Sequence, residues 1–232
     1  MKKLFSAILI LAMVLSFGIS VFADEAVPGL PVYASAEEVD VAELLAGNAL
    51  GKILDTFGNI ELTYIMDAVF PDQTSHSESV FTEYLIDGVY YASGSQDYGD
   101  AVIESFYECN EADPYQYIKG TGYSDKAEYP VEKYMEHLNA PQVPYPEEGQ
   151  VLDVQSVEDV DGLFVIDYSV SNADGSGHPQ VATICIDPVT SLITAFKYVW
   201  PFDAEGVGYT EYKYDGTIAY GVDSEPNYSV RG

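Results

Sequence analysis

The chain has 232 residues and a formal net charge of −29 at pH 7, from 9 Lys and Arg against 38 Asp and Glu. This charge excludes nucleic acids and anionic membranes as partners, because both repel an acidic surface. With 47% hydrophobic residues, the chain can bury a core and is not a disordered acidic tail. Evenly spread acidic residues are typical of an exported protein that must stay soluble.

The first 23 residues have the pattern of a secretory signal peptide. Lys2 and Lys3 precede an apolar run over residues 4–14, and Val21 and Ala23 are small residues at a cleavage site. Since the run is shorter than the roughly 20 residues that a membrane span needs, we expect cleavage after Ala23 and no transmembrane segment in the mature chain. The protein is therefore expected to be secreted, either extracellular or associated with the cell surface.

Residues 24–35 lack periodicity and are predicted to form a flexible lead-in to a single domain over residues 36–232. A long amphipathic helix is predicted over residues 35–57. Ser35 and Glu38 have the spacing of a capping box, and Gly58 suits the end of a helix. Apolar residues three and four apart form the stripe that we expect to face the core: Val41, Leu44, Leu45, Leu50, Ile53, Leu54 and Phe57.

The residues after this helix alternate between apolar and polar, as strands do. In the first half, strands are predicted over residues 60–70, 79–86, 89–91, 101–109 and 115–118, with a polar loop over residues 93–100. Asp87-Gly88 is a hairpin signal, because both residues tolerate positive φ.

A second, short helix is predicted to begin at Pro130 and to reach Leu138. Residues 140–146 contain three prolines and are expected to be an extended crossover between two halves of one sheet. The second half is predicted as a meander over residues 151–160, 163–170, 181–186, 192–200, 207–214 and 217–222, with turns at Asp161-Gly162 and Asp215-Gly216. Many hairpins and no long crossover helices favour an antiparallel α+β fold.

No motif in the sequence identifies a reaction. His76, His137 and His178 have no metal-ligand spacing, so we expect neither a metal site nor a cofactor. The segments 93–95 and 174–178, which combine serine with glycine, are not nucleophile elbows, and carboxylates are too numerous for any pair to stand out. Cys109 and Cys185 leave two alternatives open, a disulfide bond or two buried thiols.

The 20 tyrosines are the remaining feature of note. Tyrosine suits a half-buried strand surface, and it also lines sites for sugars and apolar ligands. If a ligand binds on the helix-facing side of the sheet, alternation along the first and the late strands predicts the residues that contact it: Leu62, Tyr64, Met66, Phe196, Tyr198 and Trp200. Plain core packing would demand the same alternation.

Several segments together resemble the lipoprotein-carrier (LolA/LppX-like) superfamily of exported half-barrels. They are Asn48-Ala49-Leu50 in the first helix, the long strand 60–70, the Tyr-rich hairpin and the turn over residues 184–193, where Asp187-Pro188 joins two late strands. The resemblance implies a curved antiparallel half-barrel, wrapped around the long helix and the short one, with an apolar cavity between sheet and helices.

Three functional hypotheses follow. The first is a non-enzymatic secreted protein that binds an apolar or amphipathic small molecule, such as a lipid, between sheet and helix. The second is a cell-surface module that binds a glycan or a protein through exposed tyrosines. The third is a hydrolase whose site is assembled from dispersed carboxylates.

Overall fold

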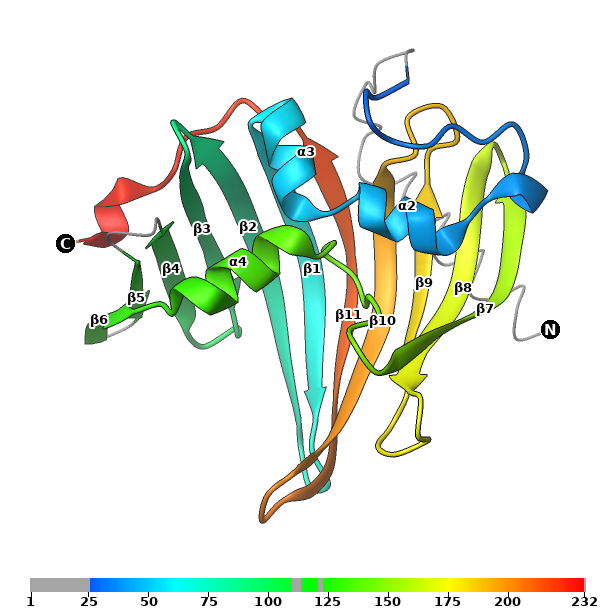
Figure 1. Ribbon diagram of the computed structural model, residues 1–232. Coiled ribbons are helices and arrows are strands. Elements are labelled where there is room, and N and C mark those ends of the chain that lie inside the picture. The colour runs from blue at the N-terminus through cyan, green and yellow to red at the C-terminus, as the bar shows by residue number, and fades with distance from the viewer. Residues whose placement is uncertain (1–25, 110–113, 121–122, 232) are drawn as a thin grey trace.

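The computed structural model describes residues 26–109, 114–120 and 123–231. The predicted signal peptide, residues 1–23, lies outside the described residues. Over the described ranges the chain forms an open antiparallel sheet with helices across one face (Figure 1). The predicted antiparallel α+β class is therefore confirmed.

The sheet has eleven strands within the described residues, in the order β6-β5-β4-β3-β2-β1-β11-β10-β9-β8-β7. Two meanders, β1 to β6 and β7 to β11, meet where β1 pairs with β11. Their bounds are β1 Asn59–Val69, β2 Thr74–Ile86, β3 Val89–Asp97, β4 Val102–Cys109, β5 Tyr115–Gly120, β6 Tyr123–Glu128, β7 Gln150–Val160, β8 Leu163–Asn172, β9 Gln180–Ile186, β10 Ile193–Ala204 and β11 Gly208–Tyr220. The sequence did not predict β6, and it placed the ends of several other strands a few residues away.

The helices lie on the concave face of the sheet (Figure 1). They are α2 Val41–Gly47, α3 Leu50–Phe57 and α4 Val131–Asn139, and two short 3₁₀ turns, η1 Ala36–Glu38 and η2 Tyr228–Arg231, complete the chain. After β6, α4 and the extended segment that follows it run from one edge of the sheet to β7 at the other. Residues 140–146 therefore form the crossover between the two halves that their prolines predicted.

The prediction of a single long helix over residues 35–57 is wrong. The chain forms η1, α2 and α3 in its place, and the Ser35 side chain caps nothing. Asp40 caps α2, because its Oδ1 accepts a 3.0 Å hydrogen bond from the Glu43 amide. The break falls at Asn48, whose buried side chain donates to the Ser191 carbonyl at 2.9 Å and accepts from the Ile193 amide at 3.3 Å. Hydrogen bonds to the β9–β10 turn thus take Asn48 out of the helix.

Two predicted irregular segments are parts of strands. Residues 93–97 of the predicted loop belong to β3, and Asp215-Gly216 lies inside β11 instead of forming a turn. The physical reason is pairing with a neighbouring strand on each side, and close approach of those neighbours explains why both positions hold glycine. A Cβ at Gly216 would lie 2.5 Å from the Thr63 carbonyl oxygen, and one at Gly94 would lie 2.3 Å from the Val80 oxygen. Gly58, in contrast, ends α3 at φ +77°, as predicted.

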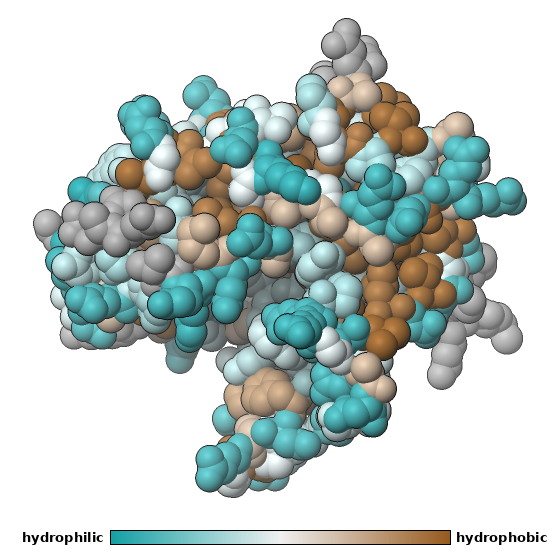
Figure 2. Space-filling view, in the orientation of Figure 1, coloured by the Kyte–Doolittle hydropathy of each residue, from teal (hydrophilic) through white to brown (hydrophobic). Residues whose placement is uncertain are grey.

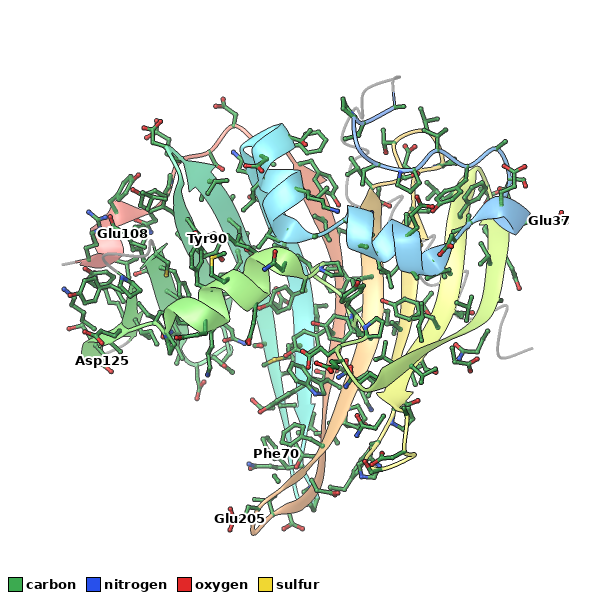
Figure 3. The ribbon with its side chains drawn as sticks, viewed as in Figure 1. Glu37, Phe70, Tyr90, Glu108, Asp125 and Glu205 are labelled. Atoms are coloured by element: carbon green, nitrogen blue, oxygen red, sulfur yellow. The ribbon has the colours of Figure 1, made fainter. Side chains whose placement is uncertain are left out.

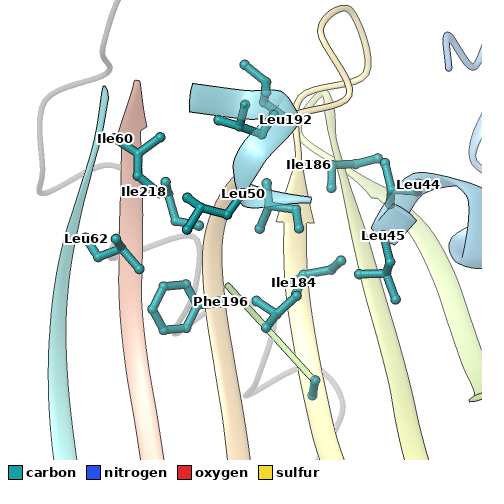
Figure 4. Close-up of a cluster of buried hydrophobic side chains, with 14 of the residues drawn as sticks. Leu44, Leu45, Leu50, Ile60, Leu62, Ile184, Ile186, Leu192, Phe196 and Ile218 are labelled. Carbon is teal, nitrogen blue, oxygen red and sulfur yellow. The ribbon is translucent and has the colours of Figure 1, made fainter. Parts of the chain in front are cut away.

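The core fills the space between the helices and the concave face (Figure 4). Leu44 and Leu45 from α2 and Leu54 from α3 are almost completely buried there, so the predicted apolar stripe packs on the sheet although the helix is split. Strand side chains that share this face complete the cluster: Ile60, Leu62, Ile184, Ile186, Phe196 and Ile218. The core lies mainly under α2 and α3, and it continues to α4 through Tyr134.

Candidate functional site

A cavity of about 290 Å³ lies between the concave face of the sheet and the α4 crossover. Figure 2 shows the surface hollowed below α4. The floor comes from six neighbouring strands of the sheet, and Tyr129, His137 and Gln142 come from the crossover side. The strand residues that line it are Leu62, Tyr64, Phe81, Glu83, Tyr90, Ala92, Tyr107, Phe196, Tyr198 and Tyr214.

Aromatic rings in mutual contact form one wall of the cavity. The Tyr198 and Tyr214 rings stack with centroids 4.5 Å apart, and the Tyr64 ring lies 5.8 Å from that of Tyr214. Antiparallel register explains this arrangement, because Tyr198 on β10 is directly opposite Tyr214 on β11. Burial raises the pKa of Tyr107 and Tyr214 to about 12, so the wall carries uncharged phenols at neutral pH.

A polar cluster occupies the part of the cavity next to α4 (Figure 3 labels Tyr90). The Glu83 Oε2 atom accepts a hydrogen bond from the Tyr90 hydroxyl at 2.9 Å and is 2.9 Å from the His137 Nε2 atom. Glu83 is only 6% exposed, and it points to the concave side because it shares the face of Phe81 on β2. His137 lies in the last turn of α4, which holds its ring against Tyr90 at a centroid distance of 5.9 Å.

The cluster shifts the pKa of its members in definite directions. Burial alone would lower the pKa of His137, but the charge of Glu83 and its hydrogen bond outweigh this effect and raise the pKa above its usual value. Burial, followed by the same carboxylate, raises the pKa of Tyr90 well above 10. The arrangement therefore favours a charged His137 paired with Glu83, beside a neutral Tyr90.

Gln142, from the crossover, adds an amide to the same cavity. Its Nε2 atom is buried and has no hydrogen-bond partner in the structure. A buried amide donor without a partner is costly, so Gln142 leaves one polar group beside the cavity unsatisfied.

No family model matches this sequence, and no curated protein matches it. Among solved structures, a DUF1329 family protein from Desulfovibrio piger is similar, with 11% identity over 75% of this chain and 90% of that one and a TM-score of 0.36. An outer membrane lipoprotein-sorting protein domain from Vibrio parahaemolyticus is also similar, with 8% identity over 74% of this chain and 88% of that one and a TM-score of 0.33. A LolA superfamily protein from Nitrosomonas europaea has 6% identity over 79% of this chain and 96% of that one, with a TM-score of 0.27.

One of these similar structures is described as a member of the LolA superfamily, which is the superfamily that the sequence resembles. TM-scores below 0.5 describe a loose likeness of fold, and the function proposed below rests on the cavity of this chain.

The structure brings together four of the six residues predicted to contact a ligand. Leu62, Tyr64, Phe196 and Tyr198 line the cavity, whereas Met66 and Trp200 do not. The long strands extend beyond the helices at that end of the sheet, so Trp200 is 50% exposed there. Sequence reasoning recovered the apolar side of the cavity because alternation determines which face a strand residue occupies.

Sequence reasoning missed the polar residues Glu83, Tyr90, His137 and Gln142. One signal was present: Glu83 interrupts the apolar face that Phe81 and Leu85 continue on β2. A carboxylate on a buried face needs partners, which predicts a polar cluster even when the partners are unknown.

Cys109 and Cys185 are two buried free thiols and do not form a disulfide bond. Cys109 on β4 faces the concave side, and Cys185 on β9 packs with Ala195 on the other face. Five strands lie between β4 and β9, so the disulfide bond is excluded by distance. Burial raises the pKa of the Cys109 thiol to about 11 and that of Cys185 to about 12.

The structure gives less support to the other two hypotheses, a surface module with exposed tyrosines and a hydrolase with dispersed carboxylates. Among the described side chains, the exposed tyrosines are Tyr209, at the tip of the β10–β11 hairpin, and Tyr228, in η2, and they do not share a surface. Glu83 is the one carboxylate among the described residues that line the cavity. Within the described residues, no group of three His, Cys, Asp or Glu side chains could hold a metal ion, and no helix has the length and apolarity to cross a membrane.

Proposed function

We propose that this protein is a secreted, non-enzymatic binding protein that holds one apolar or amphipathic small molecule between sheet and helices. The observation that carries the proposal is the cavity below α4. The cavity is partly open to solvent and provides about 290 Å³ of space between side chains of the sheet and of the crossover. Ligand pockets begin near roughly 300 Å³, which suits a single chain or a small ring system.

The composition of the cavity supports the same function. Most lining side chains are aromatic or aliphatic, and their polar atoms are phenols that burial keeps neutral. Such a surface gains free energy when a ligand displaces water from it, while a few hydrogen-bonding groups orient the ligand. The signal peptide predicted over residues 1–23 agrees with a function outside the cell.

Titration with Nile red, an uncharged dye that fluoresces in apolar surroundings, tests this function. We expect saturable binding with one site per chain. Tyr64→Ala and Phe196→Ala should each weaken binding at least tenfold, because both residues line the cavity. Tyr209→Ala is the matched control, since this aromatic residue is 48% exposed and lies at a hairpin tip far from the cavity.

Denaturant melts of the same variants separate loss of binding from loss of folding. Absence of saturable dye binding by the folded wild-type protein would refute the function. Equal weakening by the cavity variants and the Tyr209 control would place the dye elsewhere, which would refute the site.

A further inference from the structure

We infer that the cavity selects amphiphiles with an uncharged, hydrogen-bonding polar end, of the long-chain alcohol or carboxamide class, over both anionic and cationic amphiphiles. This inference rests on the proposed function and names its ligand class. Its basis is the arrangement of charges and hydrogen-bonding groups around Glu83.

Glu83 and His137 form the polar centre of the cavity, because they are within hydrogen-bonding distance of each other, and Gln142 lines the same cavity from the crossover. The opposite wall consists of the Tyr64, Tyr198 and Tyr214 rings with Leu62 and Phe196. A ligand with one polar end and an apolar body matches this polarity when its polar end lies near Glu83 and Gln142.

An anionic end finds no counter-ion in this place. Among the described residues that line the cavity there is no Lys or Arg, and His137 is already paired with Glu83. A bound carboxylate or phosphate would be buried beside the Glu83 carboxylate without a partner of its own, and burial of an unpaired charge is strongly unfavourable. The formal net charge of −29 adds a repulsive field that slows the approach of anions.

A cationic end is disfavoured for the complementary reason. The Glu83 Oε2 atom already accepts from Tyr90 and is 2.9 Å from the His137 Nε2 atom, so the protonated His137 is the counter-ion of this carboxylate. A second cation would give the buried cluster a net positive charge. The raised pKa of His137 agrees with this balance, because it favours the charged imidazole that already matches Glu83.

The remaining hydrogen-bonding capacity suits a group that both donates and accepts. The buried Gln142 Nε2 atom offers a donor, and the Glu83 carboxylate offers acceptor sites beyond the two bonds at Oε2. Hydroxyl and carboxamide groups can satisfy both partners without bringing a charge into the cavity.

Three probes with the same dansyl-labelled undecyl chain test the selectivity, one ending in a carboxamide, one in a carboxylate and one in an ammonium group. We expect the full-length wild-type chain at about pH 6, below the ordinary histidine pKa so that His137 is protonated, to bind the carboxamide at least tenfold more tightly than either charged probe. Glu83→Gln should reduce the discrimination against the carboxylate. Glu78→Gln, an exposed carboxylate on the same strand, is the matched control and should leave it unchanged.

The outcomes separate the two proposals. If the carboxylate or the ammonium probe binds as tightly as the carboxamide, the selectivity is refuted and the binding function stands. If none of the probes binds, and Nile red does not bind either, the binding function itself is refuted. The comparison of the three probes on the wild-type protein decides the selectivity even if Glu83→Gln fails to fold.

Discussion

Glu83 and His137 are 54 residues apart in the sequence, yet the His137 Nε2 atom lies 2.9 Å from the Glu83 Oε2 atom. The contact joins β2, in the middle of the first meander, to α4, the helix that leads into the second. It joins the crossover to the concave face and places an ionisable pair in a cavity whose other lining side chains are mostly aromatic or aliphatic.

The first prediction concerns pH. The pKa of His137 is raised in the folded protein, so its protonated form stabilises the fold. This contribution is complete below the unfolded-state pKa of about 6.5 and is lost as the pH rises through the higher folded-state pKa. Besides Glu83, the groups that face His137 are Tyr90, which burial keeps neutral, and Tyr129, which lines the same cavity.

Denaturant melts between about pH 6 and about pH 8 measure the effect. The free energy of unfolding should decline across this range in the wild type, and His137→Gln should remove the decline. His76→Gln is the control, because His76 pairs with Asp67 on an exposed surface. A decline that persists unchanged in His137→Gln would contradict the prediction.

The second prediction concerns the break between α2 and α3. Asn48→Ala leaves the Ser191 carbonyl and the Ile193 amide without their partner in a buried place, which should cost about 1–3 kcal/mol of unfolding free energy. The exposed Asn139→Ala should change it by less than about 0.5 kcal/mol. Equal effects of the two substitutions in urea melts would show that the Asn48 bonds contribute little.

The third prediction concerns the helices on the concave face. Leu45→Ala and Leu54→Ala each leave a cavity in the core and should cost roughly 2–5 kcal/mol. Asp55→Ala, one residue along α3 and exposed, is the control. If the leucine variants melt within about 0.5 kcal/mol of the wild type, then α2 and α3 are peripheral to the fold.

The fourth prediction concerns the cysteines. Because Cys109 and Cys185 are free and buried, neither should react with a thiol reagent in the native protein. After unfolding without a reducing agent, both should react, and mass spectrometry should show two labels per chain. A chain that takes no label under these conditions would contain a disulfide bond, contrary to the structure.

Local signals in the sequence predicted most of the sheet. Asp87-Gly88 and Asp161-Gly162 form the hairpin turns that they predict, with both Asp residues at φ +52°. Alternation also placed Leu62, Tyr64, Phe196 and Tyr198 on the concave face correctly. These predictions succeeded because turn conformation and strand parity depend on residues that are neighbours in the chain.

Where hydrogen bonds and close approaches join distant segments, the same reasoning failed. Asn48 leaves the helix for partners near Ser191, and Gly216 continues a strand because it pairs with Tyr64 on β1 and Phe196 on β10. The predicted helix and the predicted turn were locally reasonable, and tertiary contacts overrode both.

The sequence by itself determined the class of the fold, the order of most strands and the apolar face of the candidate site, since each follows from the period and chemistry of adjacent residues. Only the tertiary structure decided that β1 pairs with β11, that α4 crosses the concave face and that a cavity remains below it. The polar cluster of Glu83, Tyr90 and His137 exists only through that arrangement. Hydrogen bonds between such distant residues depend on how strands and helices pack in space, and the local periodicity of the sequence does not predict this packing.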